Sequence, residues 1–149
     1  MAQRLYLDTN VFNRPFDDQA QPRIWLEAQA VGVVLQAIEA GAWDLVGSSV
    51  LEYENSRNPY SERRAWVSRC LQLAVCQVRL DHAIIQRARV LGQQGMPALD
   101  ALHAACAEWG GVVCFLTCDD RLLATYTGSL RVISPVDFVV GILGVQSWQ

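Results

Sequence analysis

Lysine is absent from this sequence of 149 residues, and all 12 of its basic residues are arginine. The absence excludes enzymes that depend on a lysine Schiff base, a Walker-type phosphate-binding lysine or a lysine general base. The net charge of −3 does not by itself indicate a nucleic-acid binder. Carboxylates gathered at one metal site would give the same excess of negative charge, so the charge leaves this question open.

A cysteine–histidine metal site and a membrane span are also poorly supported. There is no CxxC pair, the only histidines are His82 and His103, and no apolar run approaches the roughly 18 residues of a membrane helix. The first segment, MAQRLYLDTN, has no apolar signal region. We therefore expect a cytoplasmic protein without a membrane segment whose cysteines are free thiols in a reducing compartment. These are Cys70, Cys76, Cys106, Cys114 and Cys118.

Short apolar strands alternate with helical stretches along the chain, which is typical of a parallel α/β sheet in one domain, here residues 1–149. Strands are expected at residues 4–7, 43–47, 75–78, 112–116 and 132–133. Residues 9–21 are rich in turn formers and are expected to be a loop. Helices are expected at 22–41, from Ser49 to the break at Asn58-Pro59, from there to about 73, and at 81–95, 97–109, 119–125 and from Pro135 onward.

Acidic residues follow several of the predicted strands, at the edge of a parallel sheet where ligands usually bind. Asp8 follows the first strand, and Asp100 lies at the start of an otherwise apolar helix. Two converging carboxylates at about 4 Å repel by roughly 4 kcal/mol at an effective dielectric near 20, and a divalent cation relieves this. Oxygen ligands favour Mg²⁺ or Mn²⁺, which can activate water and stabilise a phosphodiester transition state. The acids so placed are Asp8, Glu52, Glu54, Asp100, Asp119 and Asp120.

Each acid also has a purely structural interpretation. Asp8 could form an Asx-turn after its strand, Glu54 could be a solvated helix residue, and Asp100 could be an early-helix acid favoured by the helix dipole. Glu52 is better explained as the third position of a capping box that begins at Ser49. One of the paired acids at 119 and 120 is expected to be a helix N-cap.

Four motifs together resemble the PIN-domain family, the nucleases that include VapC-type toxins. Residues 5–10 (LYLDTN) resemble the opening strand and first acid, and residues 100–105 (DALHAA) resemble the third motif. Residues 48–54 (SSVLEYE) resemble the second, in which a serine is followed six positions later by a glutamate, which selects Glu54 over Glu52. Residues 115–123 (FLTCDDRLL) resemble the fourth motif, a strand followed by Thr-x-Asp.

The resemblance implies a three-layer α/β sandwich with a five-stranded parallel sheet flanked by helices. It also implies an Mg²⁺- or Mn²⁺-dependent endoribonuclease, often homodimeric, whose VapC-type members are blocked by an antitoxin. The implied acidic cluster is Asp8, Glu54, Asp100 and Asp119, with Asp8, Asp100 and Asp119 as metal ligands and Asn10, Thr117 and Asp120 in support. The alternative is a catalytically inactive PIN-like domain that binds RNA or protein.

Two rival classes with an acid after the first strand fit less well. Haloacid-dehalogenase phosphatases need a second aspartate where this chain has Asn10, and usually a lysine. Response-regulator receivers, which are binding modules, need paired acids near the first strand and a late lysine. The absence of lysine therefore counts against both classes, and the intact four-acid set argues against the inactive PIN-like module.

Three further segments have open interpretations. Arg14 could contact a phosphate, although pairing with Asp17 or Asp18 is preferred. The densest basic stretch, Arg57, Arg63, Arg64 and Arg69, could bind an RNA backbone but is more simply a solvated face. The apolar side chains of the last helix could form a dimer patch, although core packing is the commoner role of such a face. They are Phe138, Val139, Ile142, Leu143 and Trp148.

Overall fold

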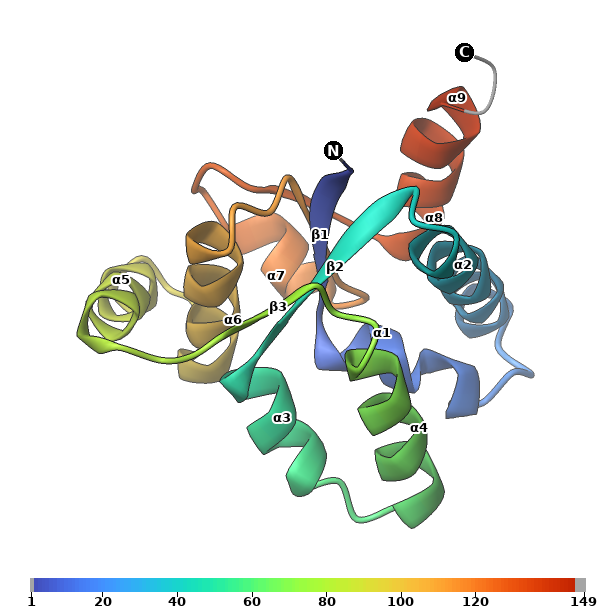
Figure 1. Cartoon of the computed structure of the whole chain (residues 1–149), viewed down its shortest axis with the longest axis horizontal. Coiled ribbons are helices and arrows are strands. Elements are labelled where there is room, and N and C mark those ends of the chain that lie inside the picture. The colour runs from blue at the N-terminus through green and yellow to red at the C-terminus, as the bar shows by residue number, and fades with distance from the viewer. Residues whose placement is uncertain (1, 147–149) are drawn as a thin grey trace.

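The computed structural model describes residues 2–146, and within them the chain forms a five-stranded sheet with all strands parallel (Figure 1). The strand order is β3-β2-β1-β4-β5, so the first strand lies in the middle. This confirms the predicted parallel α/β fold. The strands are β1 (Gln3–Leu7), β2 (Trp43–Ser48), β3 (Cys76–Val78), β4 (Cys114–Leu116) and β5 (Arg131–Ile133).

Helices flank the sheet in the three-layer arrangement expected of the fold. In Figure 1, α5 and α6 lie on one side of the sheet, α2 and α8 lie on the other, and α3 and α4 extend beyond the carboxyl end of β2. No helix in the described part of the chain is both long and apolar enough to cross a membrane. The helices are α1 (Thr9–Asn13), η1 (Arg14–Phe16), α2 (Pro22–Glu39), α3 (Ser49–Ser56), α4 (Ser61–Leu71), α5 (His82–Gln93), α6 (Ala98–Trp109), α7 (Asp120–Thr125), α8 (Pro135–Phe138), η2 (Val139–Leu143) and α9 (Gly144–Gln146).

The segment after β1 is helical, and the prediction of a loop over residues 9–21 was wrong for its first half. Asp8 caps α1 by accepting a hydrogen bond from the Thr9 backbone N–H. Val11 and Phe12 are completely buried in the core. Burial of these two side chains outweighs the turn preference of the neighbouring asparagines, and a short helix follows directly from the strand.

Helix α3 begins one residue earlier than the capping-box spacing predicted. Ser48 is its N-cap and accepts a hydrogen bond from the Leu51 backbone N–H at 3.1 Å. Ser49 instead accepts one from the Leu80 backbone N–H, and Glu52 is exposed. The predicted Ser49–Glu52 capping box is therefore wrong, because Ser48 is in the extended conformation that a cap requires.

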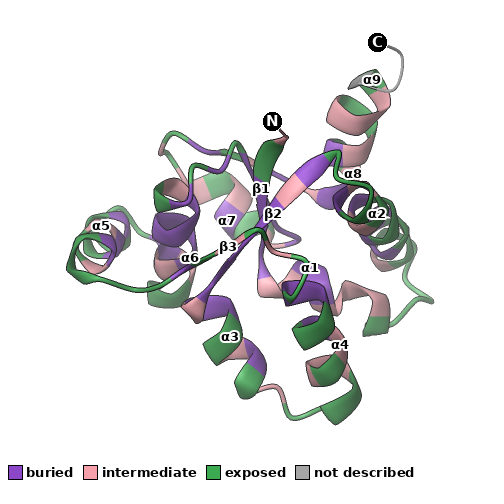
Figure 2. Ribbon diagram, viewed as in Figure 1, coloured by how far each residue is buried: buried purple, intermediate pink, exposed green. Residues whose placement is uncertain are grey.

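The core is built on the sheet, and the last helix packs against it. Tyr6 and Phe115, on adjacent strands, stack with ring centroids 5.2 Å apart. Phe138 is fully buried against Trp43, with centroids 5.1 Å apart, and Figure 2 shows that burial is concentrated in the strands and the inward helix faces.

The apolar side chains of the C-terminal helix therefore serve mainly in the core. Val139, Ile142 and Leu143 are partly buried against it, whereas Trp148 lies outside the described residues. All five cysteines are free thiols, as expected. Burial raises the pKa of the Cys118 thiol to about 12, so it stays protonated near neutral pH.

Candidate metal-binding active site

The carboxyl edge of the sheet has a topological switch point beside β1. From β1 the chain passes to β2 and β3 on one side, and then returns to place β4 and β5 on the other. Asp8 follows β1 at this point, and its backbone N–H donates to the Leu116 carbonyl of β4 at 2.9 Å. Ligands of open parallel sheets bind at such crevices, so the topology directs attention to Asp8.

The Asp8 carboxylate is buried and held by hydrogen bonds on both oxygens. It is 5% exposed. Oδ1 accepts from the Thr9 backbone N–H at 2.8 Å, and Oδ2 accepts from Thr117 Oγ1 at 2.8 Å and Asn10 Nδ2 at 3.1 Å. Burial raises the pKa of Asp8 despite these donors. The carboxylate is thus fixed in position but lacks full compensation for its lost hydration.

Asn10 and Thr117 join the ends of β1 and β4 around Asp8. The Cys118 backbone N–H donates to Asn10 Oδ1 at 3.0 Å, and the Asp119 backbone N–H donates to Thr117 Oγ1 at 3.1 Å. Asn10 Nδ2 also approaches Thr117 Oγ1 at 3.2 Å. Two of the three predicted supporting residues, Asn10 and Thr117, therefore lie where they can orient the first acid.

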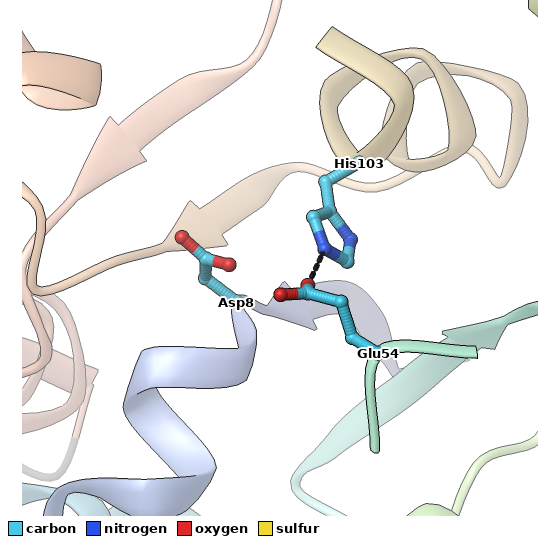
Figure 3. Close-up of side chains that lie close together, drawn as sticks. All are labelled: Asp8, Glu54 and His103. Carbon is cyan, nitrogen blue, oxygen red and sulfur yellow. Dashed lines mark hydrogen bonds and ion pairs between the residues drawn. The ribbon is translucent and has the colours of Figure 1, made fainter. Parts of the chain in front are cut away.

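Glu54 reaches the same place from α3, whereas Glu52 does not. Glu54 Oε1 accepts hydrogen bonds from Thr9 Oγ1 at 2.6 Å and from His103 Nε2. Burial of the side chain raises the pKa of Glu54, but these two hydrogen bonds outweigh it and leave the pKa below its ordinary value. One ligand atom each from Asp8, Glu54 and His103 lies within 4.8 Å of the others (Figure 3).

His103 is a site residue that the sequence reasoning missed, having considered it only for a zinc site. It is 1% exposed and lies one turn after Asp100 on α6. Its Nδ1 is 2.6 Å from the Tyr6 hydroxyl, which is itself 2.6 Å from Ser48 Oγ. The available signal was this spacing, since residues three apart on a helix share a face.

Asp100 shows most clearly that the acids are gathered. It lies half-buried in the first turn of α6. Burial, followed by the negative charges of Asp8 and Asp119, raises its pKa to about 6, and Glu54 contributes in the same direction. Among residues 2–146, nothing donates a hydrogen bond to its carboxylate or pairs with it. Asp100 is therefore a carboxylate without a hydrogen-bond donor, and the charges of Asp8, Asp119 and Glu54 raise its pKa although His103 acts in the opposite direction.

The paired acids after β4 have separate roles. Asp119 is half-buried and caps α7 by accepting from the Arg121 backbone N–H at 2.9 Å, so the expected N-cap is Asp119. Asp120 is exposed and forms a two-pronged pair with Arg23, at 2.6 and 2.8 Å. This hydrogen-bonded pair lowers the pKa of Asp120. The structure brings Asp119 toward Asp100 and directs Asp120 to Arg23.

A family model of the PIN domain matches residues 5–127, which contain all four acids of the cluster. The chain belongs to the PIN domain family. PIN domains are generally nucleases, and the predicted resemblance to this family is confirmed. No curated protein matches the chain in sequence.

Solved structures show the same fold at low sequence identity. VapBC2 from Rickettsia felis, bound to a DNA fragment from their promoter, has a TM-score of 0.60 at 14% identity over 87% of this chain and 97% of that chain. FitAcB from Neisseria gonorrhoeae has a TM-score of 0.56 at 19% identity over 88% of this chain and 97% of that chain. PAE2754 from Pyrobaculum aerophilum has a TM-score of 0.56 at 19% identity over 98% and 100%.

Four arginine side chains of this PIN domain, Arg14, Arg23, Arg63 and Arg87, pair with carboxylates outside the cluster. Arg14 pairs with the buried Glu27 at 2.7 Å and with Asp17 at 3.2 Å, and Arg63 also binds Asp17 at 3.1 Å. The preferred pairing of Arg14 with Asp17 is thus confirmed, and Glu27 was not foreseen. Among residues 2–146, no ion pair joins an arginine to Asp8, Glu54, Asp100 or Asp119. Within the basic stretch, Arg57 is exposed above the Tyr53 ring.

The donor set of the PIN domain fits a hard divalent cation. Carboxylate oxygens of Asp8 and Glu54 and a ring nitrogen of His103 lie within 4.8 Å of one another, Thr117 Oγ1 is hydrogen-bonded to Asp8, and no cysteine of the described residues belongs to this group. Oxygen-rich sites of this kind suit Mg²⁺, Mn²⁺ or Ca²⁺ rather than soft metals. Burial and the charges of Asp8 and Asp119 raise the pKa of Asp100, and a bound divalent cation would offset those charges.

Proposed function

We propose that this protein is a divalent-metal-dependent endoribonuclease that hydrolyses RNA phosphodiester bonds. In this proposal residues 1–149 form one PIN-like nuclease domain that acts in the cytoplasm, where its substrate is found. The single observation that carries it is the placement of Asp8 and Glu54 within 4.8 Å of each other, beside Asp100, whose pKa is raised to about 6 by burial and by the charges of Asp8 and Asp119. The family supports a nuclease, and RNA as the substrate is our inference.

The four acids have two kinds of role in the proposed reaction. Asp8, Asp100 and Asp119 would hold Mg²⁺ or Mn²⁺, which supplies a more acidic bound water and neutralises charge developing on the phosphate. Glu54, kept ionised by His103 and Thr9, would accept a hydrogen bond from the attacking water and orient it. Asn10 and Thr117 would keep the Asp8 carboxylate from turning away.

Asp120 and Arg14 have at most a secondary part in the proposed mechanism. Asp120 is held by Arg23 at the rim, so it would support the site only through the start of α7. Arg14 as a phosphate ligand remains a prediction, and its guanidinium would first have to leave Glu27 and Asp17. The mechanism therefore relies on the cluster and its neutral hydrogen-bond donors.

The test is cleavage of a labelled single-stranded RNA with Mn²⁺, with Mg²⁺ and with EDTA. We expect metal-dependent cleavage by the wild type and a loss of at least about 100-fold in Asp8→Asn and in Asp100→Asn. A matched control is Asp137→Asn, which removes an exposed acid from the third position of α8, as Asp100 occupies the third position of α6. Cleavage that survives both cluster substitutions would reject the mechanism, and RNA binding without any cleavage would favour the inactive binding module.

The partners we propose are RNA, an antitoxin protein and a second copy of the chain in a homodimer. The VapC-type resemblance supports these, as do neighbours whose names are VapBC2 and FitAcB. A small upstream reading frame with a DNA-binding pattern would support an antitoxin, and its product should suppress the RNA cleavage. Sedimentation of the purified chain tests the homodimer, and a monomer at micromolar concentration would reject it.

A further inference from the structure

A chain of hydrogen bonds runs from the core of the molecule to the acidic cluster. It links Ser48 Oγ to the Tyr6 hydroxyl at 2.6 Å, Tyr6 to His103 Nδ1 at 2.6 Å, and His103 Nε2 to Glu54 Oε1. Ser48 and Tyr6 are fully buried and His103 is 1% exposed. Polar groups buried so deeply are costly unless paired, so this arrangement needs an explanation beyond packing.

Each link of the chain comes from a different part of the fold. Tyr6 lies on β1, Ser48 ends β2 and caps α3, and His103 lies on α6. Tyr6 and Ser48 are 42 residues apart, and Tyr6 and His103 are 97 apart. The serine of the second motif therefore does not face a metal or substrate. It fixes the start of α3, which carries Glu54, and it also binds the tyrosine that holds the histidine.

The proton positions along the chain follow from which groups already accept. Despite burial, the hydrogen bonds from His103 and Thr9 lower the pKa of Glu54, so its carboxyl group is ionised near neutral pH and the proton between Oε1 and His103 belongs to Nε2. Nδ1 then either accepts a hydrogen bond from the Tyr6 hydroxyl or, if the ring is charged, donates one to it. With a proton on Nε2 and Tyr6 against Nδ1, neither ring nitrogen has a lone pair available to a metal.

We propose that His103 is a positioning residue, held by Tyr6 and Ser48, that aims the Glu54 carboxylate at the cluster and is not itself a metal ligand. Figure 3 shows this direction of approach, with the His103 ring on one side of Glu54 and Asp8 on the other. The proposal rests on the proposed function for its catalytic consequence. Its geometric content, a proton on Nε2 donated to Glu54, stands apart from any activity.

Two substitutions of His103 separate the two ring nitrogens. The amide nitrogen of glutamine can take the place of Nε2, whereas that of asparagine can take the place of Nδ1. We expect His103→Gln to stay within about fivefold of the wild-type kcat because it can still donate to Glu54. We expect His103→Asn to lose about 10- to 100-fold in kcat with little change in KM, the usual effect of removing a partner that orients a site carboxylate.

Tyr6→Phe tests the hydrogen bond between Tyr6 and His103, and the protein offers a matched control. Tyr126 also has a hydroxyl that donates to a carboxylate, Glu108 Oε2 at 2.5 Å, but outside the cluster. Tyr6→Phe should lower kcat several-fold, and Tyr126→Phe should leave it unchanged even if both lose stability. The proposal would be overturned if His103→Gln and His103→Asn lost kcat equally and in proportion to their losses in melting temperature. It would also be overturned if Tyr6→Phe and Tyr126→Phe changed kcat equally.

Histidine NMR tests the geometry without any cleavage assay. The sequence has only two histidines, and His82, exposed at the start of α5, serves as an internal reference. In the metal-free wild type we expect a slowly exchanging Nε2–H signal from His103. This signal should shift in Glu54→Gln, and it should persist in the wild type saturated with Mg²⁺, which is diamagnetic. Loss of that proton on Mg²⁺ binding would identify His103 as a ligand and reject the positioning role. If the wild type cuts no RNA but keeps this signal, the proposed function fails and the geometry stands.

Discussion

Replacing Asp100 by asparagine should make the metal-free protein more stable, although it removes a residue of the site. The carboxylate has no hydrogen-bond or ion-pair partner among the described residues, and its pKa rises from 3.8 to about 6 through burial and the charges of Asp8 and Asp119. That difference corresponds to about 3 kcal/mol at most, at ~1.4 kcal/mol per pH unit. The side chain is only half-buried, so solvent screening reduces the expected gain to about 1–2 kcal/mol.

The sign and the pH range follow from the direction of the shift. A carboxyl group whose folded-state pKa is raised binds its proton more tightly in the native state than in the unfolded chain. Wild-type stability therefore falls as pH rises from about 4 to about 6, and the full penalty is present above about pH 6. Asp100→Asn should exceed the wild type in stability at pH 7.5, and the advantage should shrink toward pH 4.

Thermal melting in EDTA and in Mn²⁺ should give opposite rankings of the two proteins. In EDTA at pH 7.5 the variant should melt roughly 2–8 °C higher, at about 2–4 °C per kcal/mol for a chain of this size. A Mn²⁺ concentration 100 times the dissociation constant should stabilise the wild type by ~2.7 kcal/mol and reverse the order. The variant should gain far less, because it has lost a ligand.

The control for this experiment is Asp137→Asn at the equivalent helix position of α8. Because that acid is exposed and apart from the cluster, its removal should lower stability slightly through the helix dipole, equally with and without metal. If Asp100→Asn is destabilised in EDTA as this control is, the acids do not repel one another and the electrostatic reasoning fails. If it gains as much from Mn²⁺ as the wild type, Asp100 is not a ligand.

Three other substitutions test the surroundings of the cluster. Glu27→Gln should cost roughly 2–4 kcal/mol in chemical denaturation, because it leaves the Arg14 guanidinium without its buried carboxylate, and an unchanged midpoint would contradict this. Arg57→Gln should raise KM for single-stranded RNA about 3- to 10-fold at low salt with kcat retained, since this exposed cation beside Tyr53 can reach a phosphate or base, and a salt-independent KM would reject it. Asp120→Asn should cleave RNA at the wild-type rate, and a loss like that of the clustered acids would place it in the site.

Features that depend on a strand and the residue after it could be predicted from the sequence. Asp8 and Thr117 follow apolar strands, and adjacent parallel strands bring such residues together, here within 2.8 Å. Glu54 was selected over Glu52 by its distance from Ser48, and the structure places Glu54 beside Asp8. In these cases local patterns and the architecture of a parallel sheet were enough.

Features that depend on tertiary contacts could not be read from the sequence. Helix α1 forms where turn residues predicted a loop, because Val11 and Phe12 are drawn into the core. His103 acquires its partners only when β1, the end of β2 and α6 meet, and no local pattern indicates the 97-residue contact with Tyr6. Nothing in the local sequence distinguishes Glu27 from other residues of its helix, and its role as the buried partner of Arg14 depends on the fold.

The four acids differ in how far the protein compensates them, and this difference has a functional meaning. Asp8 and Glu54 are fixed by hydrogen-bond donors from β4, α1 and α6, so their geometry is set before any cation arrives. Asp100 has no such donor in the described chain, and Asp119 is engaged only by the backbone of its own helix. If hydrogen-bond donors of the protein offset the charge of all four acids, the site would have little affinity for a cation. If they offset none of it, repulsion between the acids would destabilise the folded site. In the proposed mechanism, Asp8 and Glu54 would set the position of the metal, and the unpaired Asp100 would provide much of the driving force for binding it.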